Sequence, residues 1–391
     1  MNYIVTSPYF PQNFQKFAIE LHKAGVNVLG IGQEPYEQLD TPLKAALTEY
    51  FRVQNLEDAA EVKRAVAYLF YKHGAIDRIE SQNEYWLPLD AQLREQFNVF
   101  GMRESDLRKT RYKSAMKALF IKAGVPVVPG YLVKTHKDIA KGVAELGSPL
   151  IAKPDSGVGA AATYKLTSEA DVAHFAEAWD GAHPYFLEPF VENAAITTFD
   201  GLINAQGEIV YQTGITYYYT PIDLFDNPAL DWTYYIEKTL DPQLVDYGHK
   251  IVKAFGMRER FFHIEFFKKA NGEYIVIEYN NRPAGAFAVD VYNYTHSLDL
   301  YALYARMVCG EDIRPAVAAR TEQYGLAVTR RDYKHYAHSE ADIRAHYGDA
   351  LKAVLRMPQA FAGLQGDVMY VLTAPTLEAM QAMERYVSEQ V

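Results

Sequence analysis

The sequence contains very little cysteine. Cys309 is the only one in 391 residues, so an internal disulfide is impossible and disulfide-stapled secreted domains are excluded. No run of about 18 apolar residues occurs, which excludes a membrane-spanning helix. The first residues lack the basic segment and apolar segment of a secretory leader. These absences predict a cytoplasmic protein that does not bind membranes.

Basic residues are too few for a typical nucleic-acid-binding protein. Lys and Arg number 39 against 49 Asp and Glu, which gives a formal net charge of −10. A surface of that sign repels a phosphate backbone, so we expect no nucleic-acid partner. The mean hydropathy of −0.20 and the 49% of apolar residues are ordinary for a globular protein with a large core.

The first hundred residues alternate between strand and helix patterns. Strands are predicted at 3–6, 26–31, 50–53 and 76–80, and helices at 14–24, 57–73 and 84–97. Alternation of this kind is typical of βαβ units with a parallel sheet. We therefore expect a Rossmann-like parallel-sheet domain over residues 1–103.

The rest of the chain is dominated by strand patterns joined by short turns. One long helix is predicted at 106–123, ended by Gly124. Strands are predicted at 127–133, 149–153, 163–166, 185–191, 197–203, 208–216, 261–268 and 273–280. Short turns such as 204–207 favour antiparallel pairing. The expected fold class is α/β followed by α+β.

The most informative segment is a predicted hairpin around Asn271-Gly272. If this dipeptide forms a two-residue turn, Glu265 faces Glu278 and His263 faces Asn280. Two carboxylates directly across a strand pair repel unless a cation lies between them. Carboxylate and amide oxygens are the ligands that Mg²⁺ prefers. The alternative is two exposed glutamates on a solvated sheet face.

The other face of this hairpin is expected to be a core face, because its residues are apolar. It comprises Phe262, Ile264 and Phe266 on the first strand and Ile275, Ile277 and Tyr279 on the second.

A glycine-rich segment follows the predicted strand 149–153. Gly157, Gly159 and Ala160 imitate a dinucleotide-binding fingerprint, but such a fingerprint must open a helix, and residues 162–166 have a strand pattern. No Walker A sequence occurs. A small-residue loop preceded by Lys153 is suited to fold over a triphosphate, with backbone N–H groups and an ammonium on the anionic oxygens. A tight hairpin loop with a solvated lysine is the alternative.

The positions of these residues together resemble the ATP-grasp superfamily, which includes biotin carboxylase, carbamoyl phosphate synthetase and amino-acid ligases. The resemblance covers about residues 1–310, and its most specific part is the spacing Glu278-x-Asn280-x-Arg282. It implies an ATP-grasp fold preceded by the Rossmann-like domain. The implied divisions are a small lid subdomain at 104–186, a large subdomain with the metal site at 187–320, and a C-terminal portion at 321–391 that packs on the large subdomain.

The resemblance also implies roles for single residues. Those implied to bind ATP are Lys113, Lys153, Gly157, Gly159, Glu188, Val191 and Glu192. The lysines and glycines would contact phosphates, Glu188 and the Val191 backbone the adenine amino edge, and Glu192 the ribose. Those implied to bind Mg²⁺, with Mn²⁺ as an alternative ion, are Glu265, Glu278 and Asn280. The implied catalytic residues are Arg282, which would steady an acyl phosphate, and Lys153.

The resemblance finally implies an activity, that of an ADP-forming carboxylate–amine ligase. ATP would activate a small-molecule carboxylate as an acyl phosphate for attack by an amine, such as an amino acid. Alternatives are a non-catalytic ATP-binding protein and an ATP-grasp enzyme that uses bicarbonate, a thiol or a phosphoryl acceptor. A homodimer is the base-rate expectation for the assembly. The tyrosine-rich stretch 211–235 either lines a substrate pocket or packs the core.

Overall fold

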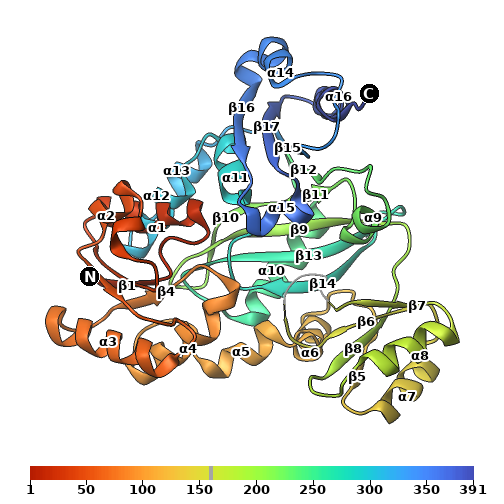
Figure 1. The fold of residues 1–391 in the computed structure, drawn as a ribbon, viewed down its shortest axis with the longest axis horizontal. Helices are drawn as coiled ribbons and strands as arrows, with labels where there is room; N and C mark the ends of the chain where they lie inside the picture. The colour runs from red at the N-terminus through yellow and green to blue at the C-terminus, as the bar shows by residue number, and fades with distance from the viewer. Residues whose placement is uncertain (158–161) are drawn as a thin grey trace.

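The computed structural model describes residues 1–157 and 162–391, which form three β-sheets surrounded by helices (Figure 1). The first sheet is parallel, with strand order β3-β2-β1-β4. Its strands are β1 (Asn2–Thr6), β2 (Asn27–Gly32), β3 (Glu49–Arg52) and β4 (Arg78–Glu80). The helices that accompany them are α1 (Gln15–Lys23), α2 (Thr41–Ala46), α3 (Ala59–His73) and α4 (Leu87–Gln96). The predicted parallel sheet is confirmed.

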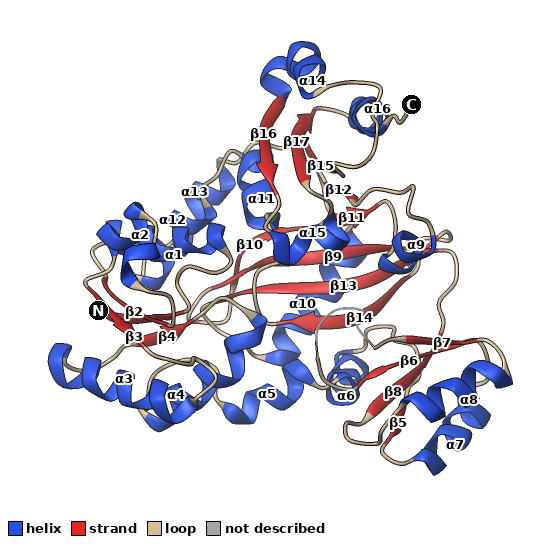
Figure 2. Cartoon of the chain, in the orientation of Figure 1, coloured by secondary structure: helices blue, strands red, loops and turns tan. Residues whose placement is uncertain are grey.

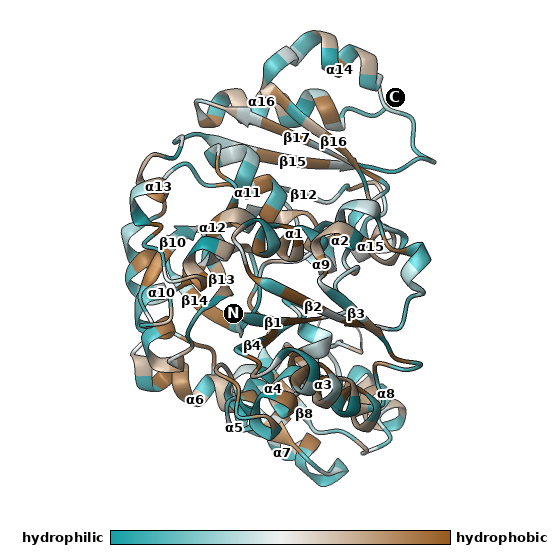
Figure 3. Cartoon of the chain, turned by 90° about the vertical axis from the view of Figure 1, so that its left-hand side faces the viewer, coloured by the Kyte–Doolittle hydropathy of each residue, from teal (hydrophilic) through white to brown (hydrophobic). Residues whose placement is uncertain are grey.

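The two faces of this sheet pack against different helices. Tyr3 and Val5 of β1 belong to one core, together with residues of α1 and of α12 (Leu300–Val308). Ile4, on the opposite face, belongs to a second core with residues of α3 and α4. Figure 3 shows the hydrophobic strands β1 and β2 between these helix layers. Both faces are therefore covered, as a parallel sheet requires.

The second sheet is small and antiparallel, with order β5-β8-β6-β7. Its strands are β5 (Tyr131–Val133), β6 (Leu150–Pro154), β7 (Tyr164–Leu166) and β8 (Tyr185–Pro189). Helices α7 (His136–Leu146) and α8 (Glu169–Ala178) pack on it around Phe175 and Leu187. Each of these helices begins at a capping box, at Thr135 and Ser168 respectively.

The third sheet has nine strands, in the order β14-β13-β9-β11-β12-β15-β17-β16, and β10 pairs with β9 (Figure 2). The first group is β9 (Ala194–Ile203), β10 (Ile209–Thr213), β11 (Ile215–Tyr217), β12 (Thr233–Ile236), β13 (Arg260–Lys269) and β14 (Tyr274–Asn280). The second group is β15 (Tyr324–Arg330), β16 (Leu351–Arg356) and β17 (Val368–Ala374). Its pairs are antiparallel, and β15 joins the two groups by pairing with β12. The predicted fold class is confirmed.

The remaining helices lie around the sheets and between them. They are α5 (Glu104–Arg111), α6 (Lys113–Ala123), α9 (Pro221–Asp226), α10 (Pro242–Phe255), α11 (Ala288–His296), α13 (Arg314–Ala318), α14 (Glu340–Tyr347), α15 (Gln359–Gln365) and α16 (Leu377–Ser388). None of the helices in the described ranges is long and apolar enough to cross a bilayer. The division of the chain at residues 103, 186 and 320 stays a prediction.

The predicted helix 106–123 is wrong, because the chain forms two helices there. Tyr112 separates α5 from α6 with an extended backbone (φ −100°, ψ 119°) and pairs with Ser156. The Asp155 carboxylate accepts hydrogen bonds of 2.8 Å from the backbone N–H and the hydroxyl of Ser114. This cap satisfies the backbone N–H of Ser114, which has no partner within the helix because the helix begins at Lys113. As a result, Lys113 is the first residue of a new helix.

The hairpin β13–β14 has the predicted register at Glu265 and Glu278, although its turn is not the predicted one. Lys269 and Glu273 close a three-residue loop in which Gly272 has φ +86°. This loop alone would shift the pairing by one residue. A bulge at Ile277 restores it, because Phe266 pairs with Val276 whereas Glu265 pairs with Glu278.

The bulge also changes the core face of the hairpin. Phe262, Ile264 and Phe266 are buried as predicted, but their partners in that core are Tyr274, Val276 and Tyr279. The placement of Ile275 and Ile277 on this face is therefore wrong. In the tyrosine-rich stretch, Tyr211, Trp232 and Tyr234 belong to the large core, so that stretch mainly serves packing.

Candidate functional site

The predicted metal ligands lie on the paired strands β13 and β14, Glu265 in the middle of β13 and Glu278 and Asn280 near the end of β14. Glu265 and Glu278 face each other across the strand pair, and each has its own cation. Nε2 of His263 lies 3.1 Å from Oε1 of Glu265, and Nζ of Lys113 lies 3.5 Å from Oε2 of Glu278. The side chains of the protein therefore already balance the repulsion expected between the two carboxylates.

His263 is held in place by Asp200 on β9. Its Nδ1 atom lies 2.7 Å from Oδ1 of Asp200, and Tyr292 of α11 donates a 2.6 Å hydrogen bond to the other oxygen of that carboxylate. Burial lowers the pKa of His263, but Asp200 and Glu265 outweigh this effect and raise the pKa to about 9. His263 is therefore an imidazolium at neutral pH. Burial raises the pKa of Glu265, whereas His263 keeps that pKa below its usual value.

Asn280 completes the predicted ligand set. It pairs with His263 across the hairpin and is buried, and its Nδ2 atom has no hydrogen-bond partner among the described residues. Since the oxygen and nitrogen of an amide are assigned by their hydrogen bonds, a flip of this amide would place its oxygen where no described residue donates to it. Two carboxylates and an amide oxygen form an oxygen donor set that fits Mg²⁺.

The ligand set is small. In the ranges 1–157 and 162–391, no three His, Cys, Asp or Glu side chains converge as a closed metal cage. A Mg²⁺ ion held by two carboxylates and an amide would keep open positions for water and for phosphate oxygens, as Mg²⁺ does in phosphoryl-transfer sites.

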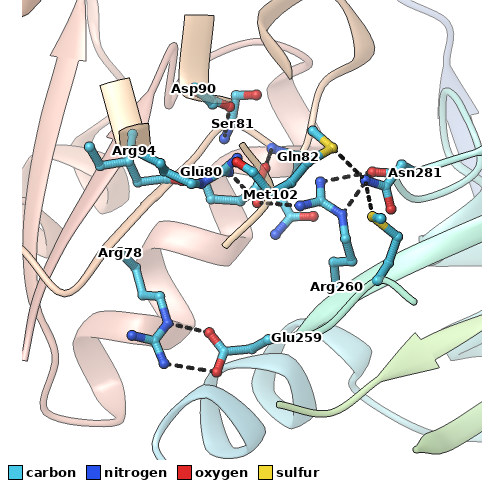
Figure 4. A network of polar contacts seen from close by, with 12 residues as sticks. Arg78, Glu80, Ser81, Gln82, Asp90, Arg94, Met102, Glu259, Arg260 and Asn281 are labelled. Carbon is cyan, nitrogen blue, oxygen red and sulfur yellow. Dashed lines mark hydrogen bonds and ion pairs between the residues drawn. The ribbon is translucent and has the colours of Figure 1, made fainter. Parts of the chain in front are cut away.

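A buried polar network anchors the residues that follow β14 (Figure 4). Arg260, at the start of β13, donates two hydrogen bonds to the carbonyl oxygen of Asn281 and one of 3.1 Å to Glu80 of β4. Arg94 of α4 donates 2.7 Å and 2.8 Å hydrogen bonds to Glu80 and to the carbonyl oxygen of Ile79. The network therefore joins the first sheet to the strand end that carries Asn280.

Two lysines and one glutamate lie together where α6 meets the small sheet. Glu188 of β8 is 7% exposed and forms ion pairs with Lys153 of β6 and Lys117 of α6. Burial raises the pKa of Glu188, but the two ammonium groups outweigh it and hold that pKa below its usual value. Burial lowers the pKa of Lys117, and Glu188 opposes this only in part. Both oxygens of Glu188 are thus engaged by lysines, whereas the resemblance assigned this residue to adenine.

Lys117 was missed by the sequence interpretation, which treats a lysine on a helix as solvated. It is 6% exposed and donates a 2.7 Å hydrogen bond to the carbonyl oxygen of Val128. A signal for it exists in the sequence, because Lys117 is one helical turn after Lys113 and lies between the apolar residues Met116 and Phe120. A buried glutamate on the neighbouring strand supplies the partner that such a lysine needs.

The other described residues that were predicted to contact the nucleotide make fewer contacts or are more exposed than Glu188. Lys113 donates a 3.3 Å hydrogen bond to the carbonyl oxygen of Gly157, where φ is +126°. Such a backbone conformation favours glycine. Val191 is half-buried and Glu192 is exposed, just after the end of β8. Gly159 lies outside the described residues.

Arg282 faces a residue that was not predicted, Glu84. Its Nε atom lies 3.4 Å from Oε2 of Glu84, and its Nη1 atom donates a 2.8 Å hydrogen bond to the carbonyl oxygen of Pro283. Burial raises the pKa of Glu84, and Arg282 only partly opposes this. Glu84 comes from the segment between β4 and α4, so the first domain contributes directly to the surroundings of the predicted catalytic arginine.

A cavity of about 680 Å³ opens beside Glu278 and Asn280. Residues of α4, α5 and the first turns of α6 line it, together with the segment around Glu84. Its size is within the range of small-molecule sites. Two of the predicted metal ligands, Glu278 and Asn280, therefore line a cavity that can hold a substrate.

Comparisons with known proteins bear on the fold of the chain. No protein-family model matches the chain. Over 324 residues, or 79% of the chain, it is 22% identical to the arginine-specific large chain of carbamoyl phosphate synthase from Geobacillus stearothermophilus. The chain spans only 28% of the length of that relative.

Two solved structures are similar over nearly the whole chain. An L-amino acid ligase from Bacillus licheniformis has a TM-score of 0.71 at 15% identity, covering 98% of this chain and 95% of that one. The biotin carboxylase domain of 2-oxoglutarate carboxylase from Hydrogenobacter thermophilus, in complex with MgADP and bicarbonate, has a TM-score of 0.69 at 17% identity, covering 95% and 86%. The expected ATP-grasp fold is thereby confirmed.

Proposed function

We propose that the chain is an ATP-dependent carboxylate–amine ligase that releases ADP and phosphate. The observation that carries the proposal is the convergence of Glu265, Glu278 and Asn280 beside Lys113, with Glu278, Asn280 and Lys113 lining a cavity of substrate size. The fold shared with an L-amino acid ligase supports it. The MgADP in the biotin carboxylase structure supports ATP and Mg²⁺ as the cofactors.

The chain offers residues for the metal ion and for the phosphates. Glu265, Glu278 and the amide of Asn280 would hold Mg²⁺. When bound, the ion supplies charge neutralisation at the transferring phosphoryl group. Lys113 and Lys153 would offset the remaining phosphate charge. Both ammonium groups are oriented by carboxylates, Glu278 and Glu188, so little reorganisation is needed when phosphate arrives.

The reaction needs positioning and charge stabilisation rather than a nucleophilic side chain. A carboxylate oxygen of the acid attacks the γ-phosphorus, the bond from that phosphorus to the bridging oxygen breaks, and ADP leaves. The amine nitrogen then attacks the acyl carbon, the bond to the phosphate oxygen breaks, and the nitrogen loses a proton. Arg282, fixed by Glu84 and the Pro283 carbonyl, would offset the charge on the acid and on the acyl phosphate.

A direct test is to incubate the protein with MgATP and mixtures of carboxylic acids and amino acids, and to measure ADP. We expect ADP release that depends on an acid, and a hydroxamate when hydroxylamine replaces the amine. AMP formation, or no ADP with any acid, contradicts the proposal. A stable phosphorylated product in place of the hydroxamate indicates the phosphoryl-acceptor alternative. The homodimer and the cytoplasmic location stay predictions.

A further inference from the structure

We infer that the cavity beside Glu278 binds the acid to be activated, through Arg111, and that this acid is a monocarboxylic acid with an apolar body. The inference rests on the proposed function and adds the class of acid substrate.

The first argument is the charge of the cavity wall beside Glu278. Lys113 lines the cavity there and pairs with Glu278, and Arg282 lies outside the lining but pairs with the lining residue Glu84. Arg111, the last residue of α5, lines the same cavity and is partly exposed. Its guanidinium forms no ion pair or hydrogen bond with any of the residues 1–157 and 162–391.

An unpaired guanidinium suits a carboxylate, because its two parallel N–H donors match the two oxygens. It is two residues before Lys113, which contacts the predicted metal ligand Glu278. A carboxylate on Arg111 therefore lies at the end of the cavity where phosphate transfer is proposed. An amine at the same position would face the positive charges of Arg111 and Lys113 instead.

The second argument is the apolar wall. Trp86 and Leu89, at the start of α4, and Leu107 of α5 line the cavity. Leu89 is 9% exposed, and Trp86 and Leu107 are half-buried. These side chains can cover an alkyl or aryl group that extends from the carboxylate, which removes apolar surface from water.

The third argument is the charge on the solvent side. Glu57 and Glu104 line the cavity and are exposed, and the hydroxyl of Tyr85, itself 62% exposed, donates to Glu57. A second carboxylate at the far end of the acid would approach these two glutamates and be repelled. The cavity should therefore discriminate against dicarboxylic acids.

Calorimetric titration of the full-length chain with three six-carbon probes tests the inference. The probes are hexanoate, its dicarboxylic counterpart adipate, and hexylamine. We expect measurable binding of hexanoate, at least tenfold weaker binding of adipate, and no binding of hexylamine. Equal binding of adipate, preferred binding of hexylamine, or no binding of any probe would overturn the inference.

Variants locate the binding. Arg111→Met should weaken hexanoate binding at least tenfold, whereas Arg108→Met, an exposed arginine on the same helix, should leave it unchanged. Replacing Glu57 and Glu104 together by Gln should reduce the difference in affinity between hexanoate and adipate. Circular dichroism and the melting temperature show whether each variant is folded. Parental hexanoate affinity in a folded Arg111→Met variant refutes the assignment.

The outcome is separable from that of the proposed function. Hexanoate binding that needs Arg111 but never leads to ADP release contradicts the ligase proposal and leaves the acid site intact. Acid-dependent ADP release that is unaffected by Arg111→Met contradicts the acid site and leaves the ligase proposal intact.

Discussion

Arg260 donates hydrogen bonds of 3.1 and 2.8 Å to the main-chain carbonyl oxygen of Asn281, through Nε and Nη2. Asn281 lies between the predicted metal ligand Asn280 and the predicted catalytic Arg282. The same guanidinium contacts Glu80 of the first sheet. One buried arginine therefore links the position of two site residues to the packing of the first domain on the large sheet (Figure 4).

Arg260→Met should lower the free energy of unfolding by about 3 kcal/mol, because removing one member of a buried ionic network leaves its partners uncompensated. Glu80 would keep only one of its two arginines, Arg94, and the Asn281 carbonyl would lose both Arg260 donors. Urea unfolding measures the change. Arg258→Met, two residues earlier and exposed, is the matched control and should change stability by less than about 0.5 kcal/mol. Parental stability of Arg260→Met would show that the network contributes little.

Glu188→Gln should also destabilise the chain by about 3 kcal/mol, because the buried ammonium groups of Lys117 and Lys153 lose their common counter-charge. ADP should restore part of this loss, since its phosphates supply negative charge to the native state. The measurement is urea unfolding with and without ADP, and Glu145→Gln, exposed on α7, is the control. If Glu188 mainly contacts adenine, the variant instead keeps its stability and loses only nucleotide affinity.

The sequence predicted much of the arrangement, because its patterns are local. Alternation of strands and helices predicted the parallel sheet, and a turn at Asn271-Gly272 predicted that Glu265 faces Glu278. The latter prediction succeeded although the turn has three residues instead of two, because the bulge at Ile277 compensates. A bulge has no strong local pattern and depends on the pairing of neighbouring strands.

The missed features depend on contacts between distant residues. The break at Tyr112 is stabilised by Asp155, whose carboxylate accepts a hydrogen bond from the backbone N–H of Ser114. Nothing in the helix pattern over 106–123 predicts this contact. The burial of Lys117 requires Glu188 on another strand. The cation at Glu278 is Lys113, which reaches it only because α6 begins at the site. Periodic sequence patterns report only local structure, so they do not predict pairs of residues that are far apart in the sequence.

Glu278→Gln separates stability from metal binding. Lys113 and His263 already balance the facing carboxylates, so the metal-free variant should stay within about 0.5 kcal/mol of the parent. It would, however, lose a charged ligand for Mg²⁺. We expect MgATP to raise the melting temperature of the parent by several degrees and that of the variant by much less. ATP with EDTA should shift the melting temperatures of parent and variant by the same amount. Glu273→Gln, exposed on the same hairpin, is the control. A parental MgATP shift in Glu278→Gln refutes the metal site.

His296 should make the fold sensitive to mild acid. Its ring is buried, with Nε2 3.0 Å from Oγ1 of Thr213 and Nδ1 3.3 Å from the carbonyl oxygen of Thr321. Burial, with a smaller contribution from Arg320, lowers the pKa of His296 to about 4. The unfolded chain takes up this proton near pH 6.5. The stability from neutral His296 is therefore complete above pH 6.5 and is lost as the pH falls towards 4.

By pH 5 this loss amounts to about 2 kcal/mol relative to pH 7. Urea unfolding at the two pH values measures it in the parent and in His296→Gln, which cannot titrate. The parent should lose about 2 kcal/mol more than the variant between pH 7 and 5, so the cost of the substitution shrinks as the pH falls. His335→Gln, at an exposed position, should have the same free energy of unfolding as the parent at both pH values. If parent and His296→Gln lose the same stability, the buried ring accepts its proton without cost, and another group accounts for any acid sensitivity.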